Sequence, residues 1–337
     1  MFFKKVVKQK SELRYDIVNK DWVVVAEGRG KRPEGFKKSA RGGSASGGNS
    51  SEAEDNMPCV FCDYFVQEKF RDKNFAVIPN KFPAFFPQKN TALKTESALF
   101  QKIPSIGFHE VVVFNDHSKP LWDFSFNEWE ELFSVYQQRY IELSKEKAVN
   151  YVSIFHNHGK AAGASLIHPH SQIMAIPFFD KNISTAINSC KEFFKEKGQC
   201  LFCAINRAEK SAKTRIVFEN TNFLATCPFA SKVNFEVVIS PKNHLPYFEK
   251  MTKEEKSDLA QIFQIVLAKI NKGLGLPDYN FYLKTSPCDD KEYPFFHWHF
   301  TIMPRISVWA GFELGVGIEI ITMPPEESAE YLKKIKI

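Results

Sequence analysis

Two histidines and a glutamine spaced two residues apart are the side chains of this sequence best placed to do chemistry together. His168, His170 and Gln172 end the stretch Asn157–Gln172, which begins with a glycine-containing loop. In an extended strand, residues two apart point to the same face. This face would therefore present two imidazoles and an amide, which suit a metal ion or a phosphoryl group. The stretch predicts a nucleotidyl-transfer site.

Each part of this stretch has a specific task in such a reaction. A neutral imidazole attacks phosphorus and forms an adduct that transfers onward, which makes His170 the candidate nucleophile. Gln172 can donate an uncharged hydrogen bond to a phosphoryl oxygen where charge builds up. Gly159, Gly163 and Ser165 would let backbone N–H groups approach phosphates closely. The alternative for His170 is a surface histidine beside a structural zinc ion, and local sequence alone leaves both open.

Cysteine pairs and distant histidines recur in both halves of the sequence and predict two zinc sites. A Cys-x-x-Cys turn brings two thiolates to one ion, and separate strands supply two imidazoles, as in tetrahedral Cys2His2 sites. The candidate ligands are Cys59, Cys62, His117 and His168 in the first half, and Cys200, Cys203, His244 and His297 in the second. His299 could replace His297. A redox dithiol or free thiols would not explain the recurring histidines, and four protein ligands leave no open position, so both sites are expected to be structural.

The order of these motifs repeats along the chain, which predicts a duplicated unit. The step from a ligand histidine to a helix-capping box is eight residues in both halves, from His117 to Ser125 and from His244 to Thr252. The two ligand histidines are 51 residues apart in the first half and 53 in the second. The sequence pattern of each half also predicts strands and an amphipathic helix that packs on them. We therefore expect an α+β fold of two mainly antiparallel units, residues 1–178 and 179–337.

The second half is expected to keep its metal site and to lack the catalytic set. Applied to the active-site residues, the repeat pairs Asn157, His170 and Gln172 with Ser286, His299 and Thr301 in that order. The remaining cysteines and three other histidines are assigned no role in this scheme: Cys190, Cys227, Cys288, His109, His156 and His158.

Composition excludes several classes of protein. The 337 residues are 44% hydrophobic and 25% charged, as in a globular enzyme, and the net charge of +6 comes without a long basic run. A double zinc module that binds nucleic acid is therefore disfavoured. The N-terminus turns polar early and no apolar stretch reaches membrane-spanning length, so we expect a cytoplasmic protein with reduced cysteines. The Gly- and Ser-rich residues 39–56 are expected to form a mobile loop.

Together these motifs resemble the galactose-1-phosphate uridylyltransferase family, a two-unit branch of the histidine-triad superfamily. The resemblance rests mainly on the string that holds Asn157, Gly163-Ala164-Ser165 and His168-Pro-His170-Ser-Gln172, and it runs from about residue 13 to 330. Other parts of the family pattern match Arg29-Gly-Lys-Arg32-Pro, Cys59 and Cys62, Asn80, Asp116-His117-Ser-Lys119 and Gly311–Glu319. On this resemblance, each half of the chain is a histidine-triad-like unit.

The resemblance implies a ping-pong transfer through a covalent nucleotidyl-histidine. His170 would attack the α-phosphorus of a nucleoside diphosphate sugar such as a UDP-sugar and release sugar 1-phosphate. A hexose 1-phosphate would then accept the nucleoside monophosphate. Residues matching Arg29 and Arg32 contact the nucleotide from a neighbouring subunit, which implies a homodimer. The other substrate contacts of the family match Asn80, Asn157, Gly163, Ala164, Ser165, Gln172, Gly317 and Glu319.

Departures from the family pattern point to a related alternative. Ser171 stands where the uridylyltransferases usually have Gly, and Glu313 replaces a family Lys that approaches the sugar phosphate. The segment Gly311–Gly317 is more similar to the branch that includes ADP-glucose phosphorylases. An adenylyl transfer with phosphate or sulfate as acceptor is therefore the nearest alternative. A histidine-triad hydrolase is a further alternative, although those hydrolases carry a third histidine at the place of Gln172.

Overall fold

The computed structural model describes residues 11–27, 59–67, 70, 73–87, 94–95, 101–102, 104–179 and 181–337. The predicted loop at residues 39–56 and the two arginines Arg29 and Arg32 lie outside the described residues. Both candidate metal sites and the stretch around His170 lie within them. None of the described helices is long and apolar enough to cross a lipid bilayer.

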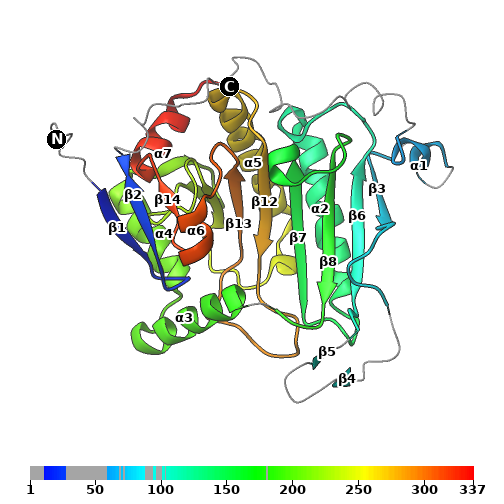
Figure 1. Ribbon diagram of the computed structural model, residues 1–337, viewed down its shortest axis with the longest axis horizontal. Coiled ribbons are helices and arrows are strands. Elements are labelled where there is room, and N and C mark those ends of the chain that lie inside the picture. The colour runs from blue at the N-terminus through cyan, green and yellow to red at the C-terminus, as the bar shows by residue number, and fades with distance from the viewer. Residues whose placement is uncertain are drawn as a thin grey trace, which may run out of the picture.

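A nine-stranded antiparallel sheet forms the centre of the molecule (Figure 1). Four neighbouring strands come from the first half of the chain and five from the second, and the pairing of β7 with β12 joins the two sets. In spatial order the strands are β3 (Phe75–Pro79), β6 (Phe108–Phe114), β8 (His170–Ile176), β7 (Tyr151–His158), β12 (Tyr279–Lys284), β13 (His299–Pro304), β11 (Val237–Pro241), β10 (Phe223–Thr226) and β9 (Ile216–Glu219).

Two long helices cover one face of this sheet, and both begin where the sequence predicts. The capping boxes that start at Ser125 and Thr252 are both present, and they open α2 (Phe126–Leu143) and α5 (Lys253–Leu274). In such a box two otherwise unpaired backbone N–H groups find side-chain acceptors. Figure 1 shows both helices behind the sheet.

A single apolar core runs beneath both helices. Their buried side chains belong to one cluster with the inward-facing residues of the strands from both halves. The rings of Trp129 on α2 and Phe263 on α5 are 5.2 Å apart. The fold is thus α+β and contains two similar sheet-and-helix arrangements, while the boundary between residues 178 and 179 stays a prediction.

The remaining elements lie around the large sheet, most of them beside its second half, with α1 next to β3 (Figure 1). A small sheet pairs β1 (Ser11–Asp16), β2 (Asp21–Ala26) and β14 (Ile320–Ile321). The connecting helix α3 (Lys181–Lys197) is followed by α4 (Leu201–Ala212), α6 (Gly311–Val316) and α7 (Pro325–Lys334). The shorter elements are α1 (Cys62–Val66), β4 (Lys94–Thr95), β5 (Gln101–Lys102) and the 3₁₀ turns Leu121–Asp123, Lys160–Ala162 and Phe248–Lys250.

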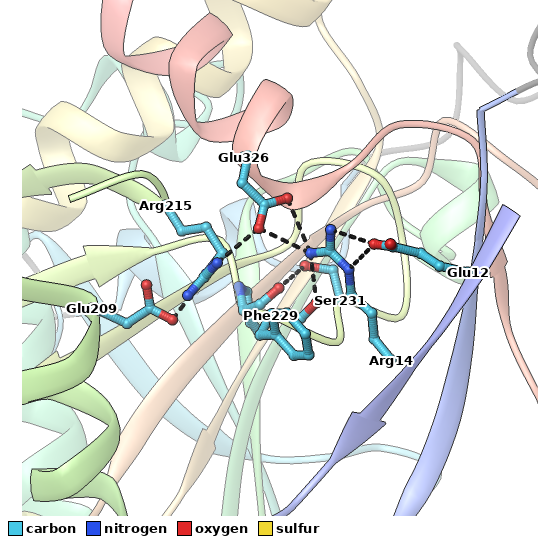
Figure 2. Close-up of polar contacts among 8 residues, drawn as sticks. Glu12, Arg14, Glu209, Arg215, Phe229, Ser231 and Glu326 are labelled. Carbon is cyan, nitrogen blue, oxygen red and sulfur yellow. Dashed lines mark hydrogen bonds and ion pairs between the residues drawn. The ribbon is translucent and has the colours of Figure 1, made fainter. Parts of the chain in front are cut away.

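A charged network attaches the N-terminal strand β1 to the C-terminal helix α7 (Figure 2). The Glu326 carboxylate accepts hydrogen bonds from Arg14, at 3.0 Å, and from Arg215, at 2.7 Å. Burial alone would raise the pKa of Glu326, but these arginines hold it below its ordinary value. The guanidinium of Arg14 also lies 4.6 Å from the ring centroid of Phe229. Strand β1 and helix α7 are therefore fixed to the same part of the second half.

Candidate active site and metal centres

The first predicted metal site converges at the edge of the sheet. Cys59 and Cys62 form a turn at the start of α1, His117 follows β6, and His168 precedes β8. The His168 Nδ1 atom lies 3.3 Å from Cys59 Sγ and 3.1 Å from His117 Nδ1, and Cys62 Sγ lies 3.4 Å from His117 Nδ1. All four donor atoms lie within 4.8 Å of one another. Segments far apart in the sequence thus present one sulfur–nitrogen cluster.

The second predicted site has the same construction. Cys203 Sγ lies 3.6 Å from the Nδ1 atoms of both His244 and His297, and Cys200 Sγ lies 3.9 Å from His297 Nδ1. These four atoms also lie within 4.8 Å of one another. His297 joins this group and His299 does not, because the Nδ1 atom of His299 bonds to the carbonyl of His297 at 3.2 Å.

Both clusters fit a tetrahedral zinc ion. Ligands about 2.0–2.3 Å from an ion at tetrahedral angles lie roughly 3.3–3.8 Å apart, close to the separations observed. His168, His244 and His297 each donate Nε2–H to a backbone carbonyl, that of Phe114, Pro294 and Pro241 in that order. These bonds leave Nδ1 as the bare nitrogen that faces the cluster, as expected of metal-binding imidazoles whose other ring nitrogen is held by a hydrogen bond.

The two thiols of the second cluster are hydrogen-bonded to each other. This bond lowers the pKa of Cys203 and raises that of Cys200. A bound cation would favour the thiolate form of both. The residues present suit zinc at both places.

His170 lies on the face of β8 that points away from α2. The residues before and after it in the sequence, Pro169 and Ser171, are buried, and Ser171 accepts a 2.5 Å hydrogen bond from Tyr136 of α2. The His170 Nδ1–H donates to the carbonyl of His168 at 2.8 Å. Since that bond fixes the tautomer, Nε2 carries the lone pair. Burial lowers the pKa of His170, and its bond to the His168 carbonyl offsets this only in part, so the imidazole is neutral at neutral pH.

The turn of the first metal cluster also packs against His170. Phe61 lies between the two cysteines of that turn, and its ring centroid is 5.2 Å from that of His170. The second half repeats the contact, because Phe202 lies 4.6 Å from His299. A metal ion that holds the turn in place would therefore also restrict the adjacent imidazole.

Gln172 and Asn157 are side-chain amides whose oxygens are bonded within the protein. The oxygen of Gln172 lies 2.8 Å from Nε2 of His109, a residue assigned no role from the sequence. The Asn157 oxygen accepts from Asn280 Nδ2 at 2.8 Å, across the junction of β7 and β12. Asn280 is itself oriented, since it also donates to the Ala162 carbonyl and accepts from Arg305. Both catalytic-site amides are thus supported by residues that the sequence analysis missed.

Asn80 follows β3 and approaches the same group. Its oxygen accepts a 2.8 Å hydrogen bond from the Phe82 backbone N–H, and its nitrogen lies 3.1 Å from His109 Nε2. The structure thus brings Asn80, His109 and Gln172 together. No local sequence signal singles out His109, because Glu110 is a second polar residue of the same strand; His109 lies two residues before Val111, which pairs with Gln172.

The conformation of the loop between β7 and β8 requires glycine at positions 159 and 163. Gly159 has φ +81°, and a Cβ there would lie 1.9 Å from the Asp278 carboxylate, which accepts from the Ala161 N–H. Gly163 has φ +83° in the left-handed region. The N–H groups of Gly163 and Ala164 donate to carbonyls of this loop, so they are engaged within it. Ser165 is exposed.

Strand register corrects one expectation about the second half. His156 pairs with Ser171, which brings the next residue, Asn157, opposite His170, and Lys284 pairs with His299. Lys284, and not Ser286, is therefore the counterpart of Asn157, because the loop before His297 is two residues longer than the loop before His168. The pairing of His170 with His299 and of Gln172 with Thr301 agrees with the register.

The second half has a cavity beside His299, the counterpart of His170. It has a volume of about 810 Å³, and its lining includes His299, Thr301, Lys284 and Glu319 but neither His170 nor Gln172. Burial lowers the pKa of His299 to about 3. Glu319 is buried beside Lys232, 3.5 Å away, and Gly317 ends α6 with φ +75°. These two proposed substrate contacts lie in the second half, apart from His170.

Comparisons with known proteins cover nearly the whole chain. The family profile described as galactose-1-phosphate uridyl transferase, N-terminal domain, matches residues 2–179. A second profile, described as a domain of unknown function, matches residues 124–335.

Two curated relatives and one solved structure are similar over nearly their full length. An ADP-glucose phosphorylase of Arabidopsis thaliana is 32% identical, and the match covers 98% of this chain and 95% of the relative. A galactose-1-phosphate uridylyltransferase of Thermotoga maritima is 30% identical, with coverage of 97% and 99%. The crystal structure of the Arabidopsis thaliana ADP-glucose phosphorylase with bound ADP-glucose superposes with a TM-score of 0.80, at 29% identity, and covers 97% of this chain and 100% of that one.

Proposed function

Since the chain belongs to the galactose-1-phosphate uridylyltransferase family, we propose that it transfers a nucleoside monophosphate between a nucleoside diphosphate sugar and a hexose 1-phosphate. The group transferred is UMP, and it is carried as a covalent adduct on His170. The observation that carries this proposal is the neutral His170 imidazole, whose bare Nε2 lies on the same strand face as the Gln172 amide.

The reaction divides into two displacements at the α-phosphorus. The lone pair of His170 Nε2 forms a P–N bond while the bond to the bridging oxygen breaks, and sugar 1-phosphate leaves with that electron pair. A phosphate oxygen of the second sugar phosphate then forms the new P–O bond, and the P–N pair returns to Nε2. No proton transfer is required, since a phosphate is a weakly basic leaving group. Gln172, Asn157 and Asn80 would donate hydrogen bonds to phosphate or ribose oxygens.

The two metal clusters have a structural task in this scheme. Zinc, when bound, would supply a cross-link that holds each Cys-x-x-Cys turn to the ends of two strands. In the first half His168 is a proposed ligand, and the carbonyl of the same residue holds His170 Nδ1. The chain thus couples metal binding to the orientation of the nucleophile without placing the ion at the phosphate.

An adenylyl transfer is the second candidate, and the similarity to ADP-glucose phosphorylase favours it. That relative has slightly higher sequence identity than the Thermotoga maritima uridylyltransferase, at 32% against 30%. The covalent step at His170 is the same in both, and only the base and the acceptor differ. In this alternative ADP-glucose is the donor and inorganic phosphate or sulfate is the acceptor.

We further propose a homodimer in which Arg29 and Arg32 of one subunit reach the nucleotide of the other. The support within the described residues is an exposed apolar surface around α6. The side chains of Val308, Leu314 and Val316 are 92%, 72% and 57% exposed. Exposed apolar side chains that gather in one patch are characteristic of subunit interfaces, and these three lie within nine residues of the chain. A cytoplasmic location stays a prediction.

Isotope exchange tests the two-step mechanism. UDP-glucose and labelled glucose 1-phosphate are incubated with the protein and no second acceptor, and ADP-glucose is treated in parallel. The label should enter UDP-glucose if the protein transfers UMP, or ADP-glucose if it transfers AMP, because the first displacement is reversible on its own. His170→Gly should abolish this exchange. Transfer of the nucleotide to a second sugar phosphate, without any exchange of label in the absence of that acceptor, would refute the covalent intermediate.

A further inference from the structure

The surroundings of Gln172 contain a buried histidine that the transfer mechanism does not use. His109 lies on β6, is 8% exposed, and has both ring nitrogens within hydrogen-bonding distance of other groups. Nδ1 lies 3.2 Å from the Ala84 backbone N–H, and Nε2 lies 2.8 Å from Gln172 Oε1. Asn80 Nδ2 lies 3.1 Å from the same Nε2 atom.

A backbone N–H group decides which nitrogen of His109 carries the proton. The Ala84 N–H can only donate, so Nδ1 must be the bare acceptor. In a neutral imidazole the other nitrogen then holds the proton, and Nε2–H donates to Gln172 Oε1. The Asn80 NH₂ group is itself a donor, so its 3.1 Å contact with Nε2 is not a hydrogen bond. An acceptor is needed there, which fixes the Gln172 amide with its oxygen toward His109 and its NH₂ group away from it.

The neighbouring amides are oriented in the same sense. The Asn80 oxygen is bonded to the Phe82 backbone N–H, and the Asn157 oxygen to Asn280 Nδ2. Among the described residues, no acceptor bonds to the NH₂ groups of Gln172 or Asn157. The site therefore presents amide nitrogens, which attract phosphate oxygens, and withholds amide oxygens, which would repel them.

We propose that His109 is a positioning residue for nucleotidyl transfer. It donates from Nε2 to Gln172 Oε1 and so keeps the Gln172 NH₂ group directed at the phosphoryl oxygen on which charge builds up. Without this bond the amide can rotate by half a turn and present its oxygen to the anionic substrate. The role rests on the proposed function of Gln172, and His109 itself does not touch the substrate.

Two conservative variants separate this role from a structural one. In His109→Gln the longer amide can place an NH₂ group where Nε2–H stood, which keeps the donor to Gln172 and loses the acceptor for Ala84. In His109→Asn the shorter amide can accept from Ala84 but does not reach Gln172. The positioning role predicts that His109→Asn is slow and His109→Gln retains most activity, whereas a role in holding the Ala84 turn predicts the reverse.

The measured quantity is the rate of nucleotidyl-His170 formation in single turnovers, with kcat and KM for the nucleotide sugar. We expect His109→Asn to slow the adduct about tenfold or more, with KM changed by less than about threefold, since the bond serves the transition state. Placed in a Gln172→Ala background, His109→Asn should add less than about twofold, because residues that act through one another are not additive.

Several outcomes would overturn the inference. Equal slowing by His109→Asn with and without Gln172, an unimpaired His109→Asn, or a His109→Gln variant as slow as His109→Asn would each refute it. Far-UV circular dichroism and zinc content show that the compared variants are folded. A wild-type protein that forms no adduct would refute the proposed function and His109 with it, whereas a wild-type adduct with one of the above results refutes His109 alone.

Discussion

At the scale of single residues, backbone carbonyls decide what each histidine can do. His168 donates Nε2–H to Phe114 and turns Nδ1 toward the cysteines, while His170 donates Nδ1–H to His168 and leaves Nε2 bare. Two histidines separated by one residue thus expose opposite nitrogens. One suits a metal cluster and the other suits phosphorus.

Zinc analysis of two variants tests this division of roles. His168→Ala should lose the first-site ion and retain the second, because a site needs all four ligands for tight binding. His170→Gly should retain both ions, because none of the four clustered donor atoms belongs to it. Metal is measured by mass spectrometry on protein of known concentration, with Cys190→Ser as a control that should bind as much zinc as wild type. An unchanged count in His168→Ala, or a loss in His170→Gly, would reverse the assignment.

At the scale of elements, the two halves meet inside one sheet, and the second half supports the active site of the first. The contact is between β7 and β12, where Asn280 donates to Asn157 and is held in turn by Arg305. The duplication therefore contributes more than a second metal site. It supplies a rigid neighbour for the strand that carries Asn157.

Asn280→Ala tests this support. Removal of the donor frees the Asn157 amide to rotate, so we expect nucleotidyl transfer to fall about tenfold with zinc content unchanged. Asn220→Ala is a matched control, because Asn220 bonds to Asp258 and Gln261 near the opposite edge of the sheet. Steady-state rates for both variants decide the question. Equal rates in Asn280→Ala and wild type would show that the β7–β12 junction has no part in catalysis.

A buried carboxyl group before β11 gives the protein a pH-dependent stability. Burial raises the pKa of Glu236 from 4.5 to about 7, although its carboxylate accepts from the Lys232 N–H. Between these values the folded state binds more protons than the unfolded state, so the contribution of Glu236 to stability falls as pH rises from about 4.5 to 7. Above pH 7 the folded protein holds an unfavourable buried charge.

Glu236→Gln should remove this dependence, because the amide keeps an oxygen for Lys232 and cannot ionise. Relative to wild type, the variant should melt a few degrees higher at pH 8.5 and show a smaller difference at pH 5.5. Thermal unfolding followed by circular dichroism at both values provides the comparison. A difference in melting temperature that is the same at both pH values would contradict the raised pKa.

Much of the site could be predicted from the sequence because it depends on local patterns. The Cys-x-x-Cys turns, the capping boxes at Ser125 and Thr252, and the spacing around His170 are all short-range signals. His109 and Asn280 could not be found in this way, because they meet Gln172 and Asn157 only through strand register. The mispairing of Asn157 with Ser286 has the same cause, since residue counts across loops of unequal length do not give register.

At the scale of the whole molecule, the proposed homodimer would complete each active site with residues of two subunits. Neither Arg29 nor Arg32 is described, and their place at the partner's nucleotide is carried by the family pattern alone. The exposed apolar side chains of Val308, Leu314 and Val316 are consistent with a covered surface at α6.

Subunit complementation tests the shared site. His170→Gly and the double variant Arg29→Ala, Arg32→Ala should each be nearly inactive alone. Co-expressed, half of the dimers are mixed, and each mixed dimer holds one site with both His170 and the arginines. Activity should then recover to about a quarter of the wild-type value. Sedimentation confirms that the variants are dimers, and an inactive mixture of dimers would place the arginines in the same subunit as their His170.

The central claim is a covalent nucleotide on His170, and the mass of the intact protein measures it most directly. Wild type and His170→Gly are incubated separately with UDP-glucose, UDP-galactose and ADP-glucose. The mass of each intact protein is measured by mass spectrometry before and after treatment with mild acid. An acid-labile uridylyl adduct on wild type alone is the predicted result, and an adenylyl adduct would assign the phosphorylase-like activity at the same residue. An adduct that persists in His170→Gly, or free nucleoside monophosphate that accumulates without any adduct, would contradict the account.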